Sequence, residues 1–331
     1  MTRNVSVLIN NYNYARYLRH AIDSVLKQTY PQIELVVVDD GSTDESREIL
    51  LSYGPRIRLV LKENGGQASA INAAFAASTG EIICLLDADD YYSPEAVERI
   101  VASWDDNTHI LHHRLQAVDN EGRRGGFNPD LGEAFEPSTV IPLLMSQGCY
   151  ASPPTSGLVY SRALLEKILP MPEASWRICA DSYLVTVSPF FAPVAMMPES
   201  VAYYRRHGSN AFDSFGGSAT CRTIRRPILE RHTNLTGLRY ELVEKFGREK
   251  GLPPPTLVQS DICFYRLLLY RSGPYNLRHA ATLYGDLLRH LWREPAKFGL
   301  RLKRTLAGTL LFLGPRVILR SIYVQMFSSA V

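Results

Sequence analysis

The sequence lacks the glycine-rich loops by which many α/β proteins hold a nucleotide. No G-x-G-x-x-G follows its first apolar run, and no G-x-x-x-x-G-K-[ST] occurs anywhere in the 331 residues. Such loops place backbone N–H groups around the phosphates in dinucleotide-binding proteins and in P-loop NTPases. Their absence excludes these two modes of phosphate binding, so a nucleotide bound by this chain must be held in another way.

Paired cysteines and long apolar runs are missing as well. The five cysteines are scattered and form no Cys-x-x-Cys pair, which excludes the common zinc and redox motifs and favours a reducing cytoplasm. The N-terminus passes directly into an apolar strand, so we expect no signal peptide. In the C-terminal tail, the uncharged run at 305–315 is too short to span a bilayer.

The chain also has little net charge, and that charge is unevenly distributed. A net charge of +3 does not favour a nucleic-acid partner. The tail at 295–331, however, carries six lysine and arginine residues and no acid, which leaves the first 294 residues net acidic. Because leucine and phenylalanine alternate with these basic residues, the tail is predicted to lie on an anionic membrane surface. The alternative is a basic helix that packs on the body of the protein or on a partner subunit.

What the sequence does contain is a regular succession of apolar strands and helices. Short apolar runs occur at 5–9, 33–38, 57–61 and 82–86, and each is followed by a segment with helical periodicity. Strands that alternate with helices predict an α/β fold with a mostly parallel sheet. Each of these strands ends in polar or acidic residues, which should meet at the carboxyl edge of the sheet, where ligands bind in such folds.

The most distinctive of these strand ends is an acidic cluster. Asp87, Asp89 and Asp90 follow the five apolar residues at 82–86 directly. Carboxylates are rarely buried without a partner, and hard oxygen ligands at this spacing suit Mg²⁺ or Mn²⁺ that carries a diphosphate. Alone, such a cluster is more often a solvated turn, so the prediction depends on the other strand ends.

Four motifs, in order and at matching spacing, resemble the family 2 glycosyltransferases of GT-A fold. They are Asn10-Asn11-Tyr12-Asn13, Val38 to Asp44 (VDDGSTD), Asn64-Gly65-Gly66 through Asn72, and Asp87-Ala88-Asp89-Asp90. The resemblance covers roughly the first 105 residues closely. It implies a Rossmann-like, mostly parallel sheet flanked by helices, and transfer of a sugar from a nucleotide diphosphate.

The resemblance also implies roles for individual residues. Tyr12 would pack on the nucleotide base and Asp39 would bind its edge, whereas Asp40 would lie near the ribose or the diphosphate. Asp89 and His207 would hold the divalent metal, with Arg205 or Arg206 offsetting phosphate charge. For His207, the alternatives are a contact with the diphosphate and an exposed position in a loop. The full set implied to contact the nucleotide sugar is Asn10, Tyr12, Asp39, Asp40, Asn64, Gln67, Asp87 and Ala88. For Tyr12 a core position is the alternative, and for Asn64 a turn or capping role.

In the second half of the chain, Asp181 matches the position of the family's general base. An inverting transfer needs one carboxylate that accepts the proton of the attacking hydroxyl, although an acid at this position can also be a helix cap. Residues expected to contact the acceptor are Trp176, Thr155 and Ser156. A core position is the alternative for Trp176.

Two regions are predicted: a GT-A catalytic domain at 1–215 and a helical region at 216–331 that includes the tail. The expected activity is inverting transfer from a nucleotide sugar, preferably a UDP-sugar, to a growing glycan. That glycan could be lipid-linked and belong to a cell-surface polysaccharide, with the enzyme in the cytoplasm or peripheral on the inner face of the plasma membrane. The alternatives are a nucleotidyltransferase and a non-catalytic protein that binds sugar nucleotides.

Overall fold

The computed structural model describes residues 3–129, 135–207, 226–255 and 277–293, together with 305, 306 and 309. They divide between two compact units. The first comprises 1–140 and 151–210, and the second comprises 141–150 and 211–331. The domain boundary predicted at residue 215 falls outside the described residues and stays a prediction.

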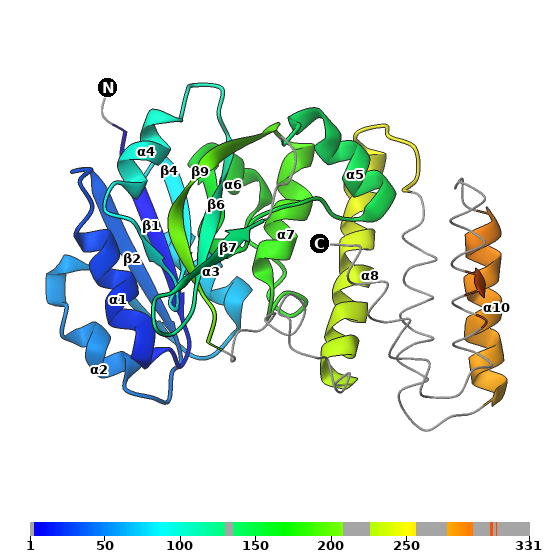
Figure 1. The fold of residues 1–331 in the computed structure, drawn as a ribbon, viewed down its shortest axis with the longest axis horizontal. Helices are drawn as coiled ribbons and strands as arrows, with labels where there is room; N and C mark the ends of the chain where they lie inside the picture. The colour runs from blue at the N-terminus through cyan, green and yellow to red at the C-terminus, as the bar shows by residue number, and fades with distance from the viewer. Residues whose placement is uncertain are drawn as a thin grey trace. The chain divides into compact units, whose positions relative to one another are not determined.

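The first unit is built on a nine-stranded sheet with the order β3-β2-β1-β4-β8-β6-β9-β5, in which β7 pairs with β6 (Figure 1). The strands are β1 (Val5–Asn11), β2 (Ile33–Asp40), β3 (Arg58–Lys62), β4 (Ile82–Asp87), β5 (Tyr91–Tyr92), β6 (Ile110–Val118), β7 (Arg124–Asn128), β8 (Leu158–Ser161) and β9 (Val194–Arg205). The first four strands are parallel, as the alternating pattern predicts. The antiparallel strand β8 joins β4 to β6, which again runs parallel to β9.

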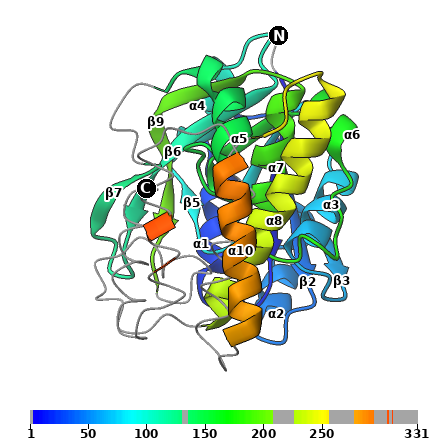
Figure 2. The same ribbon diagram turned by 90° about the vertical axis from the view of Figure 1, so that its right-hand side faces the viewer.

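Helices cover both faces of the parallel strands. They are α1 (Ala15–Leu26), α2 (Ser46–Leu51), α3 (Gln67–Ala77), α4 (Ala96–Ala102), α6 (Arg162–Ile168) and α7 (Ala180–Val187). On one face α1, α2 and α4 pack against alternate strand residues such as Val7, Val37 and Cys84. The small side chains of α3 let this helix lie close to β1 and β2 on the other face (Figure 2).

The central strand β4 is a rigid support for the acids at 87–90 that follow it. Its five apolar residues, 82–86, are at most 1% exposed. Burying each such side chain contributes about 1.5–3 kcal/mol, so the strand cannot easily shift. The chain leaves the sheet at Asp87, and the carboxylates that follow therefore extend from an ordered strand end.

The second unit contains α8 (Arg226–Glu249), α10 (Leu277–Arg293) and most of α5 (Val140–Gln147). The predicted C-terminal helical region is thus present. Within the described part of the chain, no helix is long and apolar enough to cross a membrane. The basic tail at 295–331 lies almost entirely outside the described residues, so its predicted membrane contact stays a prediction.

Candidate active site

The strand register brings the polar ends of β1, β2 and β4 together. Asn10 lies opposite Asp87, and Asn11 lies opposite Asp39. Nδ2 of Asn10 donates to Oδ1 of Asp87 at 3.1 Å, and Nδ2 of Asn11 donates to Oδ1 of Asp39 at 2.8 Å. The two asparagines therefore hold the acids of the neighbouring strands at one edge, as the parallel sheet predicts.

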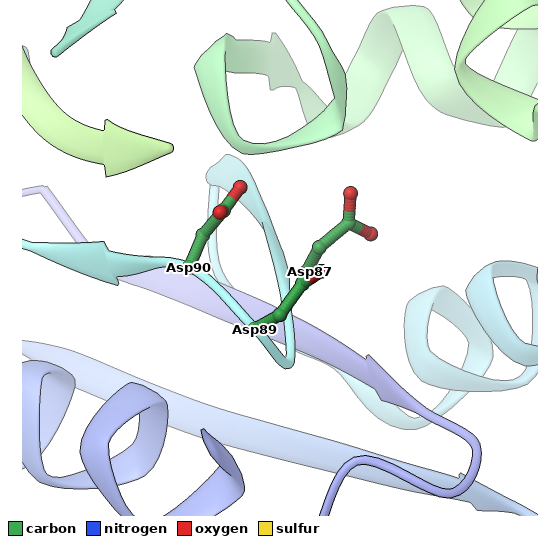
Figure 3. A group of neighbouring side chains, drawn as sticks. All are labelled: Asp87, Asp89 and Asp90. Atoms are coloured by element: carbon green, nitrogen blue, oxygen red, sulfur yellow. The ribbon is translucent and has the colours of Figure 1, made fainter. Parts of the chain in front are cut away.

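Asp87, Asp89 and Asp90 form a tight group of carboxylates (Figure 3). One oxygen of each lies within 4.8 Å of the others. Burial, and then the charges of Asp89 and Asp181, raises the pKa of Asp87 to about 7. Burial likewise raises the pKa of Asp90 well above its ordinary value. Crowded carboxylates of this kind favour a proton or a bound cation.

Within this group, both carboxylate oxygens of Asp90 accept hydrogen bonds from other residues of the protein. Ser156 Oγ accepts the backbone N–H of Asp87 at 3.0 Å and donates its own proton to Oδ2 of Asp90 at 2.6 Å. Oδ1 of Asp90 accepts the backbone N–H of Arg205 at 2.9 Å. Asp90 thus anchors the turn after β4 to the η3 turn (Thr155–Gly157) and to the end of β9.

Asp89 is held differently, because its carboxylate faces a histidine. Nε2 of His207 lies 2.9 Å from Oδ2 of Asp89, and the His207 side chain is almost completely buried. The imidazole ring stacks on Tyr17 with 4.8 Å between ring centroids, and Tyr14 packs against it edge-on at 5.8 Å. The structure therefore brings together Asp89 and His207, which lie 118 residues apart in the sequence.

Arg205 supports the same turn. Its Nε donates to the backbone oxygen of Asp89 at 2.9 Å, and its guanidinium lies about equally far from Tyr17 and Tyr91, at 5.0 and 5.1 Å from their ring centroids. Nη2 of Arg205 lies 2.8 Å from Nδ1 of His20. The resemblance implied that Arg205 or Arg206 offsets phosphate charge. The contacts of Arg205 with Tyr17, His20 and Tyr91 were not predicted, since these residues of α1 and β5 carry no motif.

Tyr12 and Asp39 mark the edge that would receive the nucleotide base. Tyr12 is 45% exposed, which removes the alternative of a core aromatic. The next residue, Asn13, has a left-handed backbone with φ of 60°, and its Oδ1 accepts the backbone N–H of Thr43 at 2.7 Å. Ser42 N donates to Asp39 at 3.2 Å. These bonds join the loop after β1, which carries Tyr12, to the loop after β2.

The side chains of Asp40 and Asn64 form hydrogen bonds with nearby residues of the same chain. The carboxylate of Asp40 accepts Nζ of Lys62 at 2.7 Å and the N–H groups of Gly65 and Gly66 at 2.9 and 2.7 Å. Asn64 donates to the backbone oxygen of Asp40 and accepts from Arg177. Both residues shape the loop before α3. Their predicted contacts with the nucleotide sugar stay predictions.

The remaining predicted residues lie on the η3 turn and around the start of α7. Asp181 is in the first turn of α7 and is partly exposed, and its charge acts on Asp87. Thr155 and Ser156 are buried in the η3 turn. Trp176 is 1% exposed and packs edge-on against Tyr183, which fits the core alternative better than an acceptor platform. Ala88, 2% exposed, separates the two acids of the D-x-D pair.

The resemblance seen in the motifs is also found across longer stretches of the chain. Residues 6–141 match the family model described as Glycosyl transferase family 2. Over these residues the chain carries a glycosyltransferase family 2 domain. An uncharacterized glycosyltransferase from Nostoc sp. is 41% identical over 212 residues, which cover 62% of this chain and 66% of that protein.

Two further comparisons extend this finding. The chondroitin synthase of Pasteurella multocida is 46% identical over 97 residues, which cover 28% of this chain but only 10% of the synthase. Staphylococcus aureus TarS, residues 1–349, crystallised with UDP, is similar in structure with a TM-score of 0.54, at 18% identity, over 97% of this chain and 91% of that one. This likeness shows the GT-A fold. The chain spans less than two thirds of the length of these sequence relatives.

Proposed function

We propose that this protein is a metal-dependent, inverting glycosyltransferase that transfers a sugar from a nucleoside diphosphate to a hydroxyl group. The observation that carries the proposal is the meeting of three parts at one sheet edge. Tyr12 and Asp39 offer a base site, and Asp87 and Asp89 with His207 offer a cation site. Asp181 follows Ala180, whose N–H is joined to Asp87 through the side chain of Gln67.

The donor set suits a divalent cation such as Mn²⁺ or Mg²⁺. Asp89 and His207 would bind it, with Asp87 close by, because Asp90 is bonded to Ser156 and to the backbone of Arg205. Carboxylate oxygens with one imidazole are ligands that Mn²⁺ accepts readily, whereas Mg²⁺ favours oxygen alone. When bound, the cation offsets the negative charge that develops on the leaving diphosphate.

The nucleotide base would stack on the exposed ring of Tyr12, with Asp39 accepting from its polar edge. Asp39 already accepts from Asn11 and from Ser42 N, so the carboxylate is oriented before the base arrives. A uracil nucleotide is our preferred donor. The TarS crystals with UDP and with UDP-GlcNAc show that the same fold can hold such a donor.

Asp181 would act as the general base. Its carboxylate would accept the proton of the acceptor hydroxyl as that oxygen attacks the anomeric carbon from the side opposite the diphosphate. Attack from that side inverts the configuration of the anomeric carbon. Asp181 is partly exposed and so accessible to an acceptor, whereas Asp39, Asp40, Asp89 and Asp90 are buried.

The acceptor we propose is a growing glycan, which could be lipid-linked. The match of 97 residues to a chondroitin synthase supports a role in polysaccharide synthesis. A peripheral position on the inner face of the plasma membrane would bring the enzyme to a lipid-linked acceptor, and the basic tail at 295–331 would supply the attraction to anionic lipid.

A donor panel tests the proposal. UDP-, GDP- and dTDP-sugars are each incubated with the protein in Mn²⁺ or in EDTA, and the released nucleoside diphosphate is measured. We expect release from one nucleotide class in Mn²⁺ and its loss in EDTA. The variant Asp106→Asn changes an exposed carboxylate outside the site and should give the same result as the wild type. Release of pyrophosphate from nucleoside triphosphates, with no release from any sugar conjugate, would contradict the proposal and favour a nucleotidyltransferase.

A further inference from the structure

Gln67, the first residue of α3, connects three separate parts of the site. Its Nε2 donates to Oδ1 of Asp87 at 3.3 Å and to Oγ1 of Thr155 at 3.2 Å, and its Oε1 accepts the backbone N–H of Ala180 at 3.0 Å. These partners belong to the end of β4, to the η3 turn and to the start of α7. One side chain therefore bridges the acid cluster and the helix that carries Asp181.

The hydrogen-bonding capacity of this amide is almost used up. A glutamine offers two N–H donors and one oxygen acceptor, and both donors of Gln67 point at protein oxygens. The orientation of the amide is fixed as well, because the N–H of Ala180 can only donate and so must face the oxygen. Gln67 has no N–H group left to donate to a sugar nucleotide. The motif resemblance, in contrast, placed Gln67 among the residues that contact the nucleotide sugar.

The contact with Ala180 satisfies the start of a helix. The first N–H groups of any helix have no partner within that helix. Ser, Thr, Asp or Asn usually supplies an acceptor at the preceding position, but here that position is Cys179, whose thiol is only a weak acceptor. The amide oxygen of Gln67 therefore takes the role of a helix cap from another element.

Backbone hydrogen bonds also join α3 to the segment before α7, and here the N–H groups of α3 are the donors. The first two N–H groups of α3, at Gln67 and Ala68, donate to the backbone oxygens of Arg177 and Trp176 at 2.8 and 3.3 Å. Gly66 permits this approach, because a Cβ at that residue would lie 2.6 Å from the Arg177 oxygen, and its φ is +90°. The start of α3 is thus joined in both directions to the segment at 176–180 that leads into α7.

We propose that Gln67 is a positioning residue, which sets the distance between the Asp87 cluster and Asp181 and does not bind the donor. The inference rests on the proposed function, in which Asp181 acts on a sugar held near Asp87. Small displacements of a reacting group are costly, since about 1 Å can lower a rate about 100-fold. Loss of the amide should therefore lower turnover and leave nucleotide affinity unchanged.

The test uses Gln67→Met, which keeps the length of the side chain and removes its hydrogen bonds, and Gln67→Asn, which keeps the amide but shortens its reach. Asn72→Leu is the matched control. Asn72 also lies on α3, and its amide bonds the N–H and the oxygen of Met171 and a carboxylate oxygen of Glu173, not Asp87, Asp89 or Asp90. UDP binding is measured by calorimetry with Mn²⁺, and turnover as UDP release from UDP-GlcNAc with water as the acceptor.

For both Gln67 variants we expect a fall in turnover of about tenfold or more and a UDP dissociation constant within about twofold of the wild type. Asn72→Leu should change neither. A rise of fivefold or more in the UDP dissociation constant at unchanged turnover would make Gln67 a donor ligand and overturn the inference. Failure of the wild type to bind UDP would instead count against the proposed donor.

Amide hydrogen exchange tests the inference without any substrate. Gln67→Met should speed exchange at Ala180 and Asp181, because their helix start loses its acceptor, whereas Asn72→Leu should not. Gln67→Asn gives the same readout if Gln67→Met does not fold. Unchanged exchange at Ala180 in a folded Gln67 variant would show that the bond does not hold α7, and would overturn the inference.

Discussion

The ends of β2 and β4 carry similar acids at the same sheet edge, yet the two regions use them differently. At the end of β2, Asp40 is saturated by Lys62 and by the N–H groups of Gly65 and Gly66. At the end of β4, Asp87 accepts from Asn10 and Gln67 and lies within 4.8 Å of Asp89, which faces His207. The acid that is paired with a lysine holds the loop, whereas the acids that crowd one another are the ones suited to a cation.

Asp90 refines the comparison, because it lies in the crowded region and still serves the fold. Its two oxygens accept from Ser156 and from the backbone of Arg205. Position at the strand end is therefore not enough to assign a ligand role. The hydrogen-bond partners of each carboxylate decide it.

The largest expected effect concerns Asp181, which we assign to catalysis. Asp181→Asn removes the proton acceptor and should lower the rate of transfer about 10²- to 10⁴-fold. Because Asp181 is not a proposed ligand of the nucleotide, the UDP dissociation constant should stay within about twofold. Steady-state kinetics and calorimetry on the same preparation measure both. A variant that keeps more than half of its activity would remove Asp181 from the mechanism.

Asp90→Ala should act on stability instead of binding. The substitution leaves the hydroxyl of Ser156 and the N–H of Arg205 buried with no acceptor at this site, and each lost partner costs about 1–3 kcal/mol. We expect a decrease of about 2–6 kcal/mol in the free energy of unfolding, measured by urea titration. An unchanged free energy of unfolding would place Asp90 with the ligand acids.

The affinity for metal should depend on pH. The pKa of Asp87 is raised to about 7, so this carboxyl is mostly protonated at pH 6 and mostly ionised at pH 8. A cation binds the ionised form, so Mn²⁺ affinity should rise about tenfold between these two values. Titration of Mn²⁺ at both pH values, with Asp87→Asn as the comparison, measures the effect. If Asp87→Asn keeps the full pH dependence, another group is responsible.

The smallest effect is expected at Asp40. Asp40→Asn keeps the shape of the side chain and one acceptor oxygen, but its NH₂ group cannot accept from Lys62 or the glycine N–H groups. We expect a loss of about 1 kcal/mol in stability and a UDP affinity within about threefold of the wild type. A larger loss of affinity at unchanged stability would mean that Asp40 contacts the donor after all.

The parallel core and its acidic edge could be predicted because they depend on local pattern. The apolar runs set the strands, and the parallel register then brings Asn10, Asp39 and Asp87 to one edge. The D-x-D pair, Tyr12 and His207 could be predicted because each lies in a sequence motif. The antiparallel insertion of β8 between β4 and β6 was not predicted, since long-range pairing leaves no local signal.

The contacts that distinguish acids bonded within the fold from the acids that we propose as ligands could not be predicted from the sequence. Ser156 bonds Asp90 across 66 residues, and Gln67 bonds Ala180 across 113. Neither serine nor glutamine is unusual at its position, so no residue type indicates the partner. Only the fold shows that Asp90 is saturated and that Gln67 is committed to the start of α7.

The central claim is that Asp89 holds a cation that the nucleotide requires. Calorimetric titration of UDP, GDP and dTDP, each with Mn²⁺ and with EDTA, tests it most directly on the wild type, on Asp89→Ala and on the control Asp106→Asn. We predict that one nucleotide binds only with Mn²⁺, that Asp89→Ala abolishes this binding and that Asp106→Asn retains it. Equal binding in EDTA, or full binding by Asp89→Ala, would contradict the claim.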